Sequence, residues 1–262
     1  MIRVGVFGAA GRMGSTVCQA VLGDPDLELV AAVDPLHAGL DLQHAVGVDS
    51  DLHLAANASA LVDARTEVVV DFTHLDAARE NLQFAAEHGI HAVVGTTGFT
   101  EADLATYGAA FTRSSCLIVP NFAIGAVLMM RFAELAAPWF DTAEIIELHH
   151  DNKDDAPSGT ALATAERMAA ASAEWAPDPT RTDTLEHARG ATGPAGIPIH
   201  AVRMRGMVAH QEVLLGTTGQ TLSIRHDTYD RASFMPGVLL AVKRVADRPG
   251  LTVGLDGLLF DG

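Results

Sequence analysis

The sequence predicts an α/β fold in two parts, a doubly wound parallel sheet and a second α+β domain with an open, mainly antiparallel sheet. Three observations lead to this prediction. A short apolar strand runs into a glycine-rich turn and a helix, strands then alternate with helices up to residue 122, and from residue 197 apolar residues recur at every second position. We expect residues 1–123 and 233–262 to form the first domain, and residues 124–232 to form the second.

The turn after the first strand, residues 2–7, is typical of a phosphate-binding loop. It consists of Gly8-Ala9-Ala10-Gly11-Arg12-Met13-Gly14 and leads into a helix that ends near Gly23. A strand, a glycine-rich turn and a helix N-terminus together hold the pyrophosphate of a dinucleotide. The spacing is G-x-x-G-x-x-G rather than G-x-G-x-x-G, so the motif needs support from its surroundings. With that support, the turn indicates a Rossmann-like domain.

An acidic residue after the second strand, residues 27–33, supplies this support. Asp34 lies about 20 residues beyond the turn, the offset at which an acid hydrogen-bonds the adenosine ribose. The alternative is an acid that merely ends a strand. Pro35 follows, so no arginine stands at the next position to meet a 2′-phosphate, although Arg12 could do so. We therefore expect NADH or NADPH as the cofactor, with NADH preferred.

Three further strands are predicted at residues 67–72, 91–94 and 116–119. One helix between them, residues 75–88, is closed by Gly89, and the next is capped by Thr100. Ligands of such sheets bind at the carboxyl ends of the strands. The loops that begin at Gly8, Asp34, Gly95 and Pro120 could therefore form one crevice. Asp71 and His74 have a similar position, but helix capping explains them equally well.

The second part begins with an apolar helix predicted over residues 123–140 and contains a long loop at residues 177–196. Residues 199–204, 210–215 and 221–226 are predicted as antiparallel strands, with a hairpin turn at residues 217–220. An open sheet with an apolar face needs a cover, and association of subunits would supply one. A helix capped by Ser233 and a strand at residues 252–255 return the chain to the first domain.

The stretch from Glu147 to Ala161 is the least ordinary in the chain. It lies between a predicted strand, residues 143–148, and a predicted helix, residues 160–173. Ser158 is a suitable N-cap, so the backbone N–H groups of Gly159 and Thr160 would be first-turn donors at the positive end of the helix dipole. Such a helix start is a seat for an anion such as a carboxylate.

The same loop contains groups that can transfer a proton. Histidine titrates near neutrality, and Lys153 is one of two lysines among 17 basic residues. Arginine would be a poor proton donor there, because it does not deprotonate in proteins. The alternative is a solvated loop with two chance histidines. A metal site is not expected, because adjacent strand residues such as His149 and His150 face opposite ways and no partner stands at metal-ligand spacing.

Composition excludes several classes of partner. The 262 residues carry 17 basic and 33 acidic side chains, and the net charge of −16 has the wrong sign for binding nucleic acid or anionic membranes. No apolar run approaches the roughly 20 residues that span a bilayer, and we expect no signal peptide because the chain enters a strand directly. Only Cys18 and Cys116 are present, which favours a reducing cytoplasm over a disulfide framework.

Taken together, the chain resembles the 4-hydroxy-tetrahydrodipicolinate reductase (dihydrodipicolinate reductase) family of the diaminopimelate route to lysine. The resemblance covers the full length and rests on Val4–Gly14, Gly95–Phe99, Pro120–Gly125 and Glu147–Ala161. The last of these patterns is highly specific to the family, whereas the first is shared with many nucleotide enzymes.

The resemblance implies NAD(P)H-dependent reduction of 4-hydroxy-tetrahydrodipicolinate, a cyclic imine with two carboxylates, to tetrahydrodipicolinate. Water is lost, the nicotinamide delivers hydride to ring C4, and a proton comes from the pair of His149 as acid/base and Lys153 as donor. The implied substrate contacts are His150, Ser158, Gly159 and Thr160. The implied cofactor site comprises Gly8, Ala9, Ala10, Gly11, Arg12, Met13, Asp34, Gly95, Thr96, Thr97, Val119, Pro120, Asn121 and Phe122. A cytoplasmic homotetramer built through the second domain is also implied.

Two other functions stay open at this point. One is another nicotinamide-dependent enzyme of similar two-domain plan, such as an amino-acid or semialdehyde dehydrogenase. The paired histidines, Lys153 and the Ser-Gly-Thr turn speak against it. The other is a catalytically silent paralogue that binds NADH as a sensor or scaffold. Intact His149 and Lys153 argue against that function.

Overall fold

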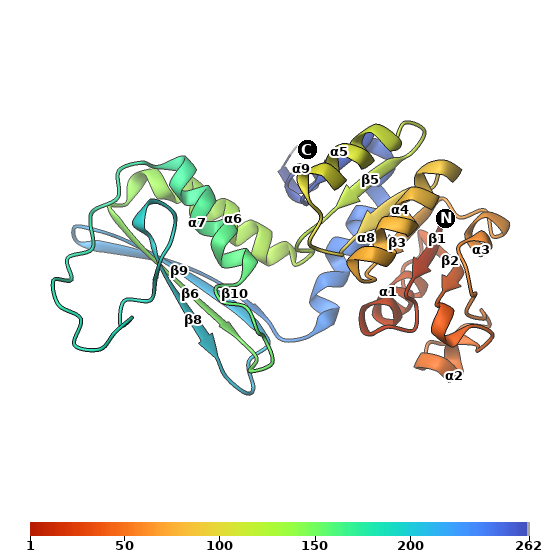
Figure 1. Cartoon of the computed structure of the whole chain (residues 1–262), viewed down its shortest axis with the longest axis horizontal. Helices are drawn as coiled ribbons and strands as arrows, with labels where there is room; N and C mark the ends of the chain where they lie inside the picture. The colour runs from red at the N-terminus through yellow and green to blue at the C-terminus, as the bar shows by residue number, and fades with distance from the viewer. Residues whose placement is uncertain (261–262) are drawn as a thin grey trace. The chain divides into compact units, whose positions relative to one another are not determined.

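The chain forms two compact units in the computed structural model, which describes residues 1–260. The first comprises Met1–Phe122 and Phe234–Gly262, and the second comprises Ala123–Ser233. The first unit therefore takes its last strand and two helices from the C-terminal segment, after the chain has built the whole second unit. Figure 1 follows this path by colour from red to blue.

The first unit contains a six-stranded sheet whose strands are all parallel. The order is β11-β5-β4-β3-β1-β2, so the chain reverses its direction of winding on either side of β1, as in doubly wound folds. The central strands are mostly apolar because both faces of the sheet are covered. The strands are β1 (Ile2–Phe7), β2 (Leu27–Val33), β3 (Val68–Asp71), β4 (His91–Val94), β5 (Ser115–Ile118) and β11 (Gly250–Val253).

Helices of the first unit cover this sheet. Helix α1 contacts α8, and α4 contacts α5. Side chains of α4 and α5, including Leu82 and Tyr107, pack with Val69 of the sheet in one buried cluster. The helices are α1 (Arg12–Leu22), α2 (Leu42–Val46), α3 (Ser59–Asp63), α4 (Leu75–His88), α5 (Glu101–Ala110), α8 (Met235–Arg244) and α9 (Asp256–Phe260), with 3₁₀ turns at Pro35–His37 and Val245–Asp247.

Local signals fix the ends of two of these helices as the sequence predicts. Thr100 and Asp103 form a reciprocal capping box at the start of α5, which satisfies two otherwise unpaired donors. Gly89 ends α4 with φ +69°, a left-handed conformation that glycine adopts without steric cost. Both predictions are confirmed, since each depends only on residues within one turn of the helix end.

The second unit is a five-stranded mixed sheet with order β10-β9-β6-β8-β7. Helices α6 and α7 contact each other and lie against one face (Figure 1), through contacts of α6 with β10 and of α7 with β6. The elements are α6 (Ile124–Ala136), β6 (Thr142–His149), α7 (Gly159–Ala171), β7 (Ala191–Thr192), β8 (Pro198–Arg203), β9 (Ala209–Thr217) and β10 (Gln220–Thr228), with 3₁₀ turns at Ala137–Trp139, Pro194–Gly196 and Arg231–Phe234.

Three sequence predictions for this half are wrong in part. Strand β8 pairs parallel with β6, because α7 and the long loop return the chain to the same end of the sheet. Helix α6 ends at Ala136, and the chain continues as a 3₁₀ turn that contains Pro138, since proline has no N–H to continue the hydrogen bonds of an α-helix. Ser233 is not a helix cap: it lies inside a 3₁₀ turn, and α8 begins at Met235.

Candidate active site

The glycine turn after β1 is shaped by close backbone approach. Gly8 has φ +65°, and a Cβ atom on Gly14 would lie 2.0 Å from the carbonyl oxygen of Gly8. Helix α1 can therefore start directly on the turn only if residue 14 is glycine. Its N-cap is Gly11, which has no side chain to cap the first N–H groups. A turn of this shape leaves backbone donors for a pyrophosphate, so these residues fit a dinucleotide.

Asp34 directly follows β2 beside this turn and is buried. Its Oδ2 atom accepts a hydrogen bond from the Ala10 backbone N–H at 3.1 Å, which ties β2 to the glycine turn. Its Oδ1 atom accepts from the N–H of Leu36 at 3.2 Å and lies 2.9 Å from Nδ1 of His37. The carboxylate thus lies beside the glycine turn, as predicted, and also caps the 3₁₀ turn that follows.

The other predicted cofactor residues lie at the same edge of the sheet. Thr96 donates a hydrogen bond from Oγ1 to the carbonyl of Thr73 at 2.7 Å, and Thr73 in turn lies against Gly8, where a Cβ atom would meet it at 2.9 Å. The Phe72 ring packs against Gly95 and against Phe122, whose ring centroid is 5.4 Å away. The loops after β1, β3, β4 and β5 therefore touch one another, and Asp34 after β2 contacts the glycine turn.

Asp71 and His74 are explained by the fold. Asp71 is buried and accepts hydrogen bonds from Thr73 at 2.7 Å and from Asn81 at 2.8 Å. Burial raises the pKa of its carboxyl, against the opposing effect of these hydrogen bonds. His74 is the N-cap of α4 and accepts from the Ala77 N–H. Capping and loop closure thus account for both residues.

In the second unit, His149 ends β6 and its imidazole is held by a buried carboxylate. Nδ1 of His149 lies 2.6 Å from Oε2 of Glu147, two residues earlier on the same face of the strand. Because a carboxylate only accepts hydrogen bonds, Nδ1 carries the proton that is donated. The other ring nitrogen, Nε2, is then the atom that can exchange a proton with a ligand.

Glu147 itself is fully buried and has three protein partners. Arg203 at the end of β8 donates to both carboxylate oxygens, at 2.8 and 2.9 Å, and the Ser158 N–H donates at 3.0 Å. Burial, the largest single influence, raises the pKa of this carboxyl, but the hydrogen bonds from His149, Arg203 and Ser158 together outweigh it and lower the pKa to about 2.

The loop between β6 and α7 carries the remaining predicted residues. Nζ of Lys153 lies 2.7 and 2.9 Å from the two carboxylate oxygens of Asp155, a contact that lowers the pKa of Asp155. His150 is exposed. The structure thus places Lys153 four residues after His149 in the same loop, with its ammonium group held by a neighbouring acid.

The start of α7 has the predicted form. Ser158 is the N-cap, and its Oγ accepts from the Ala161 N–H at 3.2 Å. A Cβ atom built on Gly159 would meet no atom within 4 Å, so the space beside Gly159 at this helix start is open. Thr160 follows within the first turn. The open space at the positive end of the helix dipole suits an anionic ligand group.

Neither Glu147 nor Arg203 is among the site residues that the sequence predicts. The structure instead pairs the two, and Arg203 Nη2 also donates to the Asp155 carbonyl at 2.6 Å. The signal available in the sequence was weak: Glu147 is a charged residue on the face of β6 that also carries Ala143 and Ile145, both buried. A buried acid at such a position requires partners, but its spacing does not identify them.

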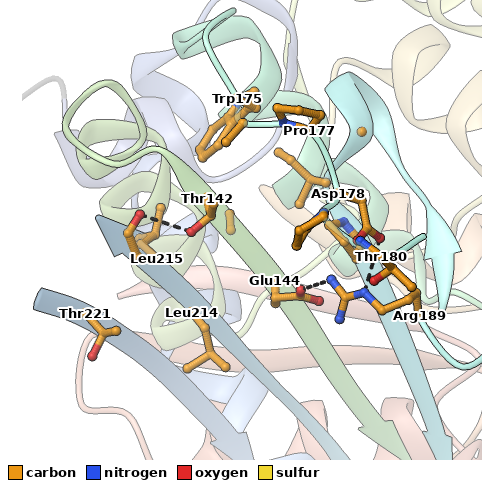
Figure 2. A pocket seen from close by; sticks show the side chains of 17 residues that line it. Thr142, Glu144, Trp175, Pro177, Asp178, Thr180, Arg189, Leu214, Leu215 and Thr221 are labelled. Atoms are coloured by element: carbon orange, nitrogen blue, oxygen red, sulfur yellow. Dashed lines mark hydrogen bonds and ion pairs between the residues drawn. The ribbon is translucent and has the colours of Figure 1, made fainter. Parts of the chain in front are cut away.

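A separate cavity of about 530 Å³ lies at the beginning of β6 in the second unit. Figure 2 shows it between Thr142 and Glu144 of β6, Leu214 of β9 and the loop that carries Trp175 and Arg189. None of its lining residues belongs to the loop from His149 to Thr160, so it is distinct from the candidate active site. Within residues 1–260, no cluster of metal-ligating side chains occurs, and no helix is long and apolar enough to cross a membrane.

A glycine turn with an acid at the next strand end, together with a second unit that carries an oriented histidine, defines a nucleotide-dependent oxidoreductase. Residues 2–122 match the family model described as "Dihydrodipicolinate reductase, N-terminus", and residues 125–259 match "Dihydrodipicolinate reductase, C-terminus". The chain belongs to the dihydrodipicolinate reductase family, whose curated members carry the name 4-hydroxy-tetrahydrodipicolinate reductase.

Relatives match over nearly the whole length. The chain is 53% identical over 262 residues to 4-hydroxy-tetrahydrodipicolinate reductase of Mycobacterium sp. (strain KMS), covering 98% of this chain and 99% of the relative. It is 51% identical to the enzyme of Corynebacterium urealyticum, covering 99% of each. A dipicolinate-bound dihydrodipicolinate reductase from Paenisporosarcina sp. TG-14 superposes with TM-score 0.86 at 40% identity, covering 98% of this chain and 99% of that one.

A more distant structure shows the fold alone: an amine dehydrogenase from Mycobacterium smegmatis has TM-score 0.65 at 15% identity, covering 97% of this chain and 95% of that one. The predicted fold class and family are confirmed. The chain is an NAD(P)H-dependent oxidoreductase of lysine and diaminopimelate biosynthesis, and its first unit is the Rossmann-type part that binds NADH or NADPH.

Proposed function

We propose that His149 and Lys153 supply the proton in the reduction of 4-hydroxy-tetrahydrodipicolinate. The observation that carries this assignment is the 2.6 Å contact of His149 Nδ1 with the buried Glu147 carboxylate, which fixes one tautomer and leaves Nε2 for the substrate. The reduced nicotinamide, when bound, supplies the hydride to ring C4. Lys153 is the second donor, because its ammonium group is held by Asp155 in the same loop and can pass a proton, which arginine cannot.

The substrate proposed for the second unit, Ala123–Ser233, is a cyclic imine with two carboxylates. One carboxylate is assigned to the start of α7, where Ser158 caps the helix and the space beside Gly159 is open. The helix dipole and the first-turn donors of Gly159 and Thr160 favour an anion there. His150 is assigned to the same ligand because it is exposed at the beginning of the loop.

The cofactor site is assigned to the first unit, Met1–Phe122 and Phe234–Gly262, with NADH preferred over NADPH. The Asp34 carboxylate lies within hydrogen-bonding distance of the glycine turn, where the adenosine ribose is held in such folds. A negative charge at this position repels a 2′-phosphate. Arg12 is exposed at the start of α1 and is the one cationic side chain of the glycine turn. We therefore expect the enzyme to use both cofactors, with NADH used more efficiently than NADPH.

The oligomer proposed is a homotetramer that covers the open face of the second sheet. Strand residues alternate between faces, so Ile146, Leu148, Val202 and Leu214 lie on the face opposite α6 and α7, where they are only partly buried. A second copy would remove this apolar area from water. We also place the enzyme in the cytoplasm, since both cysteines are buried free thiols. Light scattering should give a tetramer for the intact chain and a smaller species for Leu214→Glu.

The assay that tests the proposed residue roles follows NADH and NADPH oxidation with the product of dihydrodipicolinate synthase made in situ. We expect turnover by the intact chain and at least about a hundredfold less in His149→Gln and in Lys153→Ala, as for other positioned proton donors, with NADH binding unchanged. Unimpaired variants would contradict the assignment. Tight NADH binding without turnover would instead support a silent paralogue, and activity on aspartate semialdehyde would support another dehydrogenase.

A further inference from the structure

The carboxylate of Glu147 connects all the parts of the candidate active site in the second unit. It binds the imidazole of His149 at 2.6 Å and the N–H of Ser158 at 3.0 Å, so one group holds both the proposed proton donor and the first residue of the anion seat. Arg203, which holds the carboxylate, also binds the Asp155 carbonyl. Asp155 in turn binds Lys153. The loop is therefore anchored to one ion pair at three points, through His149, Asp155 and Ser158.

The geometry of the Glu147–Arg203 pair keeps the Glu147 carboxylate charged. A buried carboxylate is stable only when its oxygens are hydrogen-bonded and its charge is balanced. Arg203 donates a hydrogen bond to each carboxylate oxygen and balances the negative charge, and two parallel N–H···O contacts are the strongest arrangement for an arginine and a carboxylate. An ionised Glu147 has no proton to give, so it can only accept from Nδ1 of His149. A neutral amide at this place could donate to Nδ1 and select the other tautomer.

We infer that Glu147 is a positioning residue of the reaction: held ionised by Arg203, it fixes the tautomer and orientation of His149 and the placement of the α7 anion seat. The inference rests on the proposed role of His149. Under this inference the Glu147 side chain has two separate effects, one on kcat and one on KM. Through His149, Glu147 acts on proton transfer and therefore on kcat, and through Ser158 it acts on substrate binding and therefore on KM.

The rival explanation is an ion pair that merely joins β6 to β8. It predicts that removal of Glu147 lowers activity in proportion to lost folding, whichever other residues are present. A positioning role predicts instead that the effect on kcat disappears once His149 is gone, because residues that act as a unit are not additive. The double-mutant cycle of Glu147→Gln with His149→Gln distinguishes the two explanations.

We expect Glu147→Gln to lower kcat by about a hundredfold, at the low end of what a positioned proton donor contributes, and to raise KM for the imine. In the His149→Gln background, the same substitution should change kcat by less than about threefold, while KM still rises. The Kd of NADH should stay unchanged, since the proposed cofactor residues belong to the first unit. The ¹³Cδ2 chemical shift of His149 should move from the Nδ1–H to the Nε2–H tautomer in Glu147→Gln.

Glu144 supplies a matched control on the same strand. It also binds a histidine, with Oε2 2.6 Å from Nε2 of His200, and an arginine, Arg189, but it lies on the opposite face of β6. Glu144→Gln should leave kcat and the His149 tautomer unchanged. Where Glu147→Gln alone folds poorly because Arg203 is left unpaired, Glu147→Gln combined with Arg203→Met removes both charges and should show the same loss of kcat.

Three results would overturn the inference. The first is an equal fall in kcat in both backgrounds of the cycle, and the second is a His149 tautomer that does not change. The third is a kcat equal to that of the intact protein in the variant that combines Glu147→Gln with Arg203→Met. Failure of the proposed function has a different signature: the intact protein would show no turnover, or His149→Gln would be fully active, while the tautomer of His149 in the intact protein would still be Nδ1–H.

Discussion

The buried Glu147 carboxylate should make the second unit sensitive to acid. Its pKa is lowered from the ordinary value of 4.5 to about 2 in the folded protein. A carboxyl with a lower pKa in the folded than in the unfolded state stabilises the fold at pH values above its unfolded pKa, and this contribution is lost as the pH falls through the folded value. The sensitive window is therefore from about pH 5 down to about pH 2.

The size of the effect follows from this difference in pKa. A difference of about 2.5, at 1.36 kcal/mol for each pKa unit, corresponds to about 3 kcal/mol of folding free energy. No correction for solvent screening is needed because the side chain is fully buried. Linkage gives a loss of about 2 kcal/mol by pH 3, since the unfolded chain is then almost fully protonated while the folded chain is not.

The assay is urea unfolding of the intact protein and of Glu147→Gln between pH 5 and pH 3. The two tryptophans of the chain, Trp139 and Trp175, both belong to the second unit, so their fluorescence reports on the unit that contains Glu147. Other carboxylates also titrate in this range, but they contribute to both proteins and cancel in the difference. The stability advantage of the intact protein should shrink by about 2 kcal/mol. An advantage that is the same at pH 5 and pH 3 would refute the reasoning.

Three further predictions concern glycines and the ribose acid. Gly159→Ala should stabilise the fold by up to about 1 kcal/mol yet raise KM for the imine by about tenfold, which corresponds to the loss of roughly one hydrogen bond. The control is Gly108→Ala, also in a helix with no atom within 4 Å of the new Cβ, which should stabilise the fold without changing KM. Equal kinetics of the two variants would contradict the proposed anion site at the start of α7. Gly14→Ala should cost about 1–3 kcal/mol by overpacking and weaken NADH binding, measured by calorimetry, because its Cβ would lie 2.0 Å from the Gly8 carbonyl oxygen. Asp34→Asn should lower kcat/KM for NADH and raise the ratio of NADPH to NADH use; an unchanged ratio would count against a ribose contact.

The features that the sequence predicts well are those whose cause is local. Helix α4 begins at Leu75 and ends at His88, as expected from an N-cap and a following glycine that lie next to it in the chain. The same holds for the hairpin between β9 and β10, where Gly219 has φ +82° and Thr217 pairs with Gln220. A two-residue loop with such a glycine fixes the register of its strands without help from the rest of the fold.

The features that were missed depend on distant parts of the chain. A period of two predicts that residues 199–204 form a strand but says nothing of its direction, so the parallel pairing of β8 with β6 was not foreseen. The partners of Glu147 show the same limit: Arg203 is 56 residues away in sequence. The end of α6 was a different kind of error, because Pro138 is a local signal that the prediction of a helix through residue 140 did not use.

The unforeseen parallel pair is also what creates the site in the second unit. In the register of β6 and β8, His149 lies opposite Arg203, so both strands carry their carboxyl ends to the same edge of the sheet. The loop that leaves β6 there contains Lys153 and leads to the start of α7. Had β8 run antiparallel, its last residue would lie at the far end of β6, about 20 Å away for strands of this length, and Glu147 would be buried without its cation. A mostly antiparallel sheet thus uses one β-α-β crossover to place a charged pair, the proposed proton donor and a helix start together, as parallel sheets place their ligands.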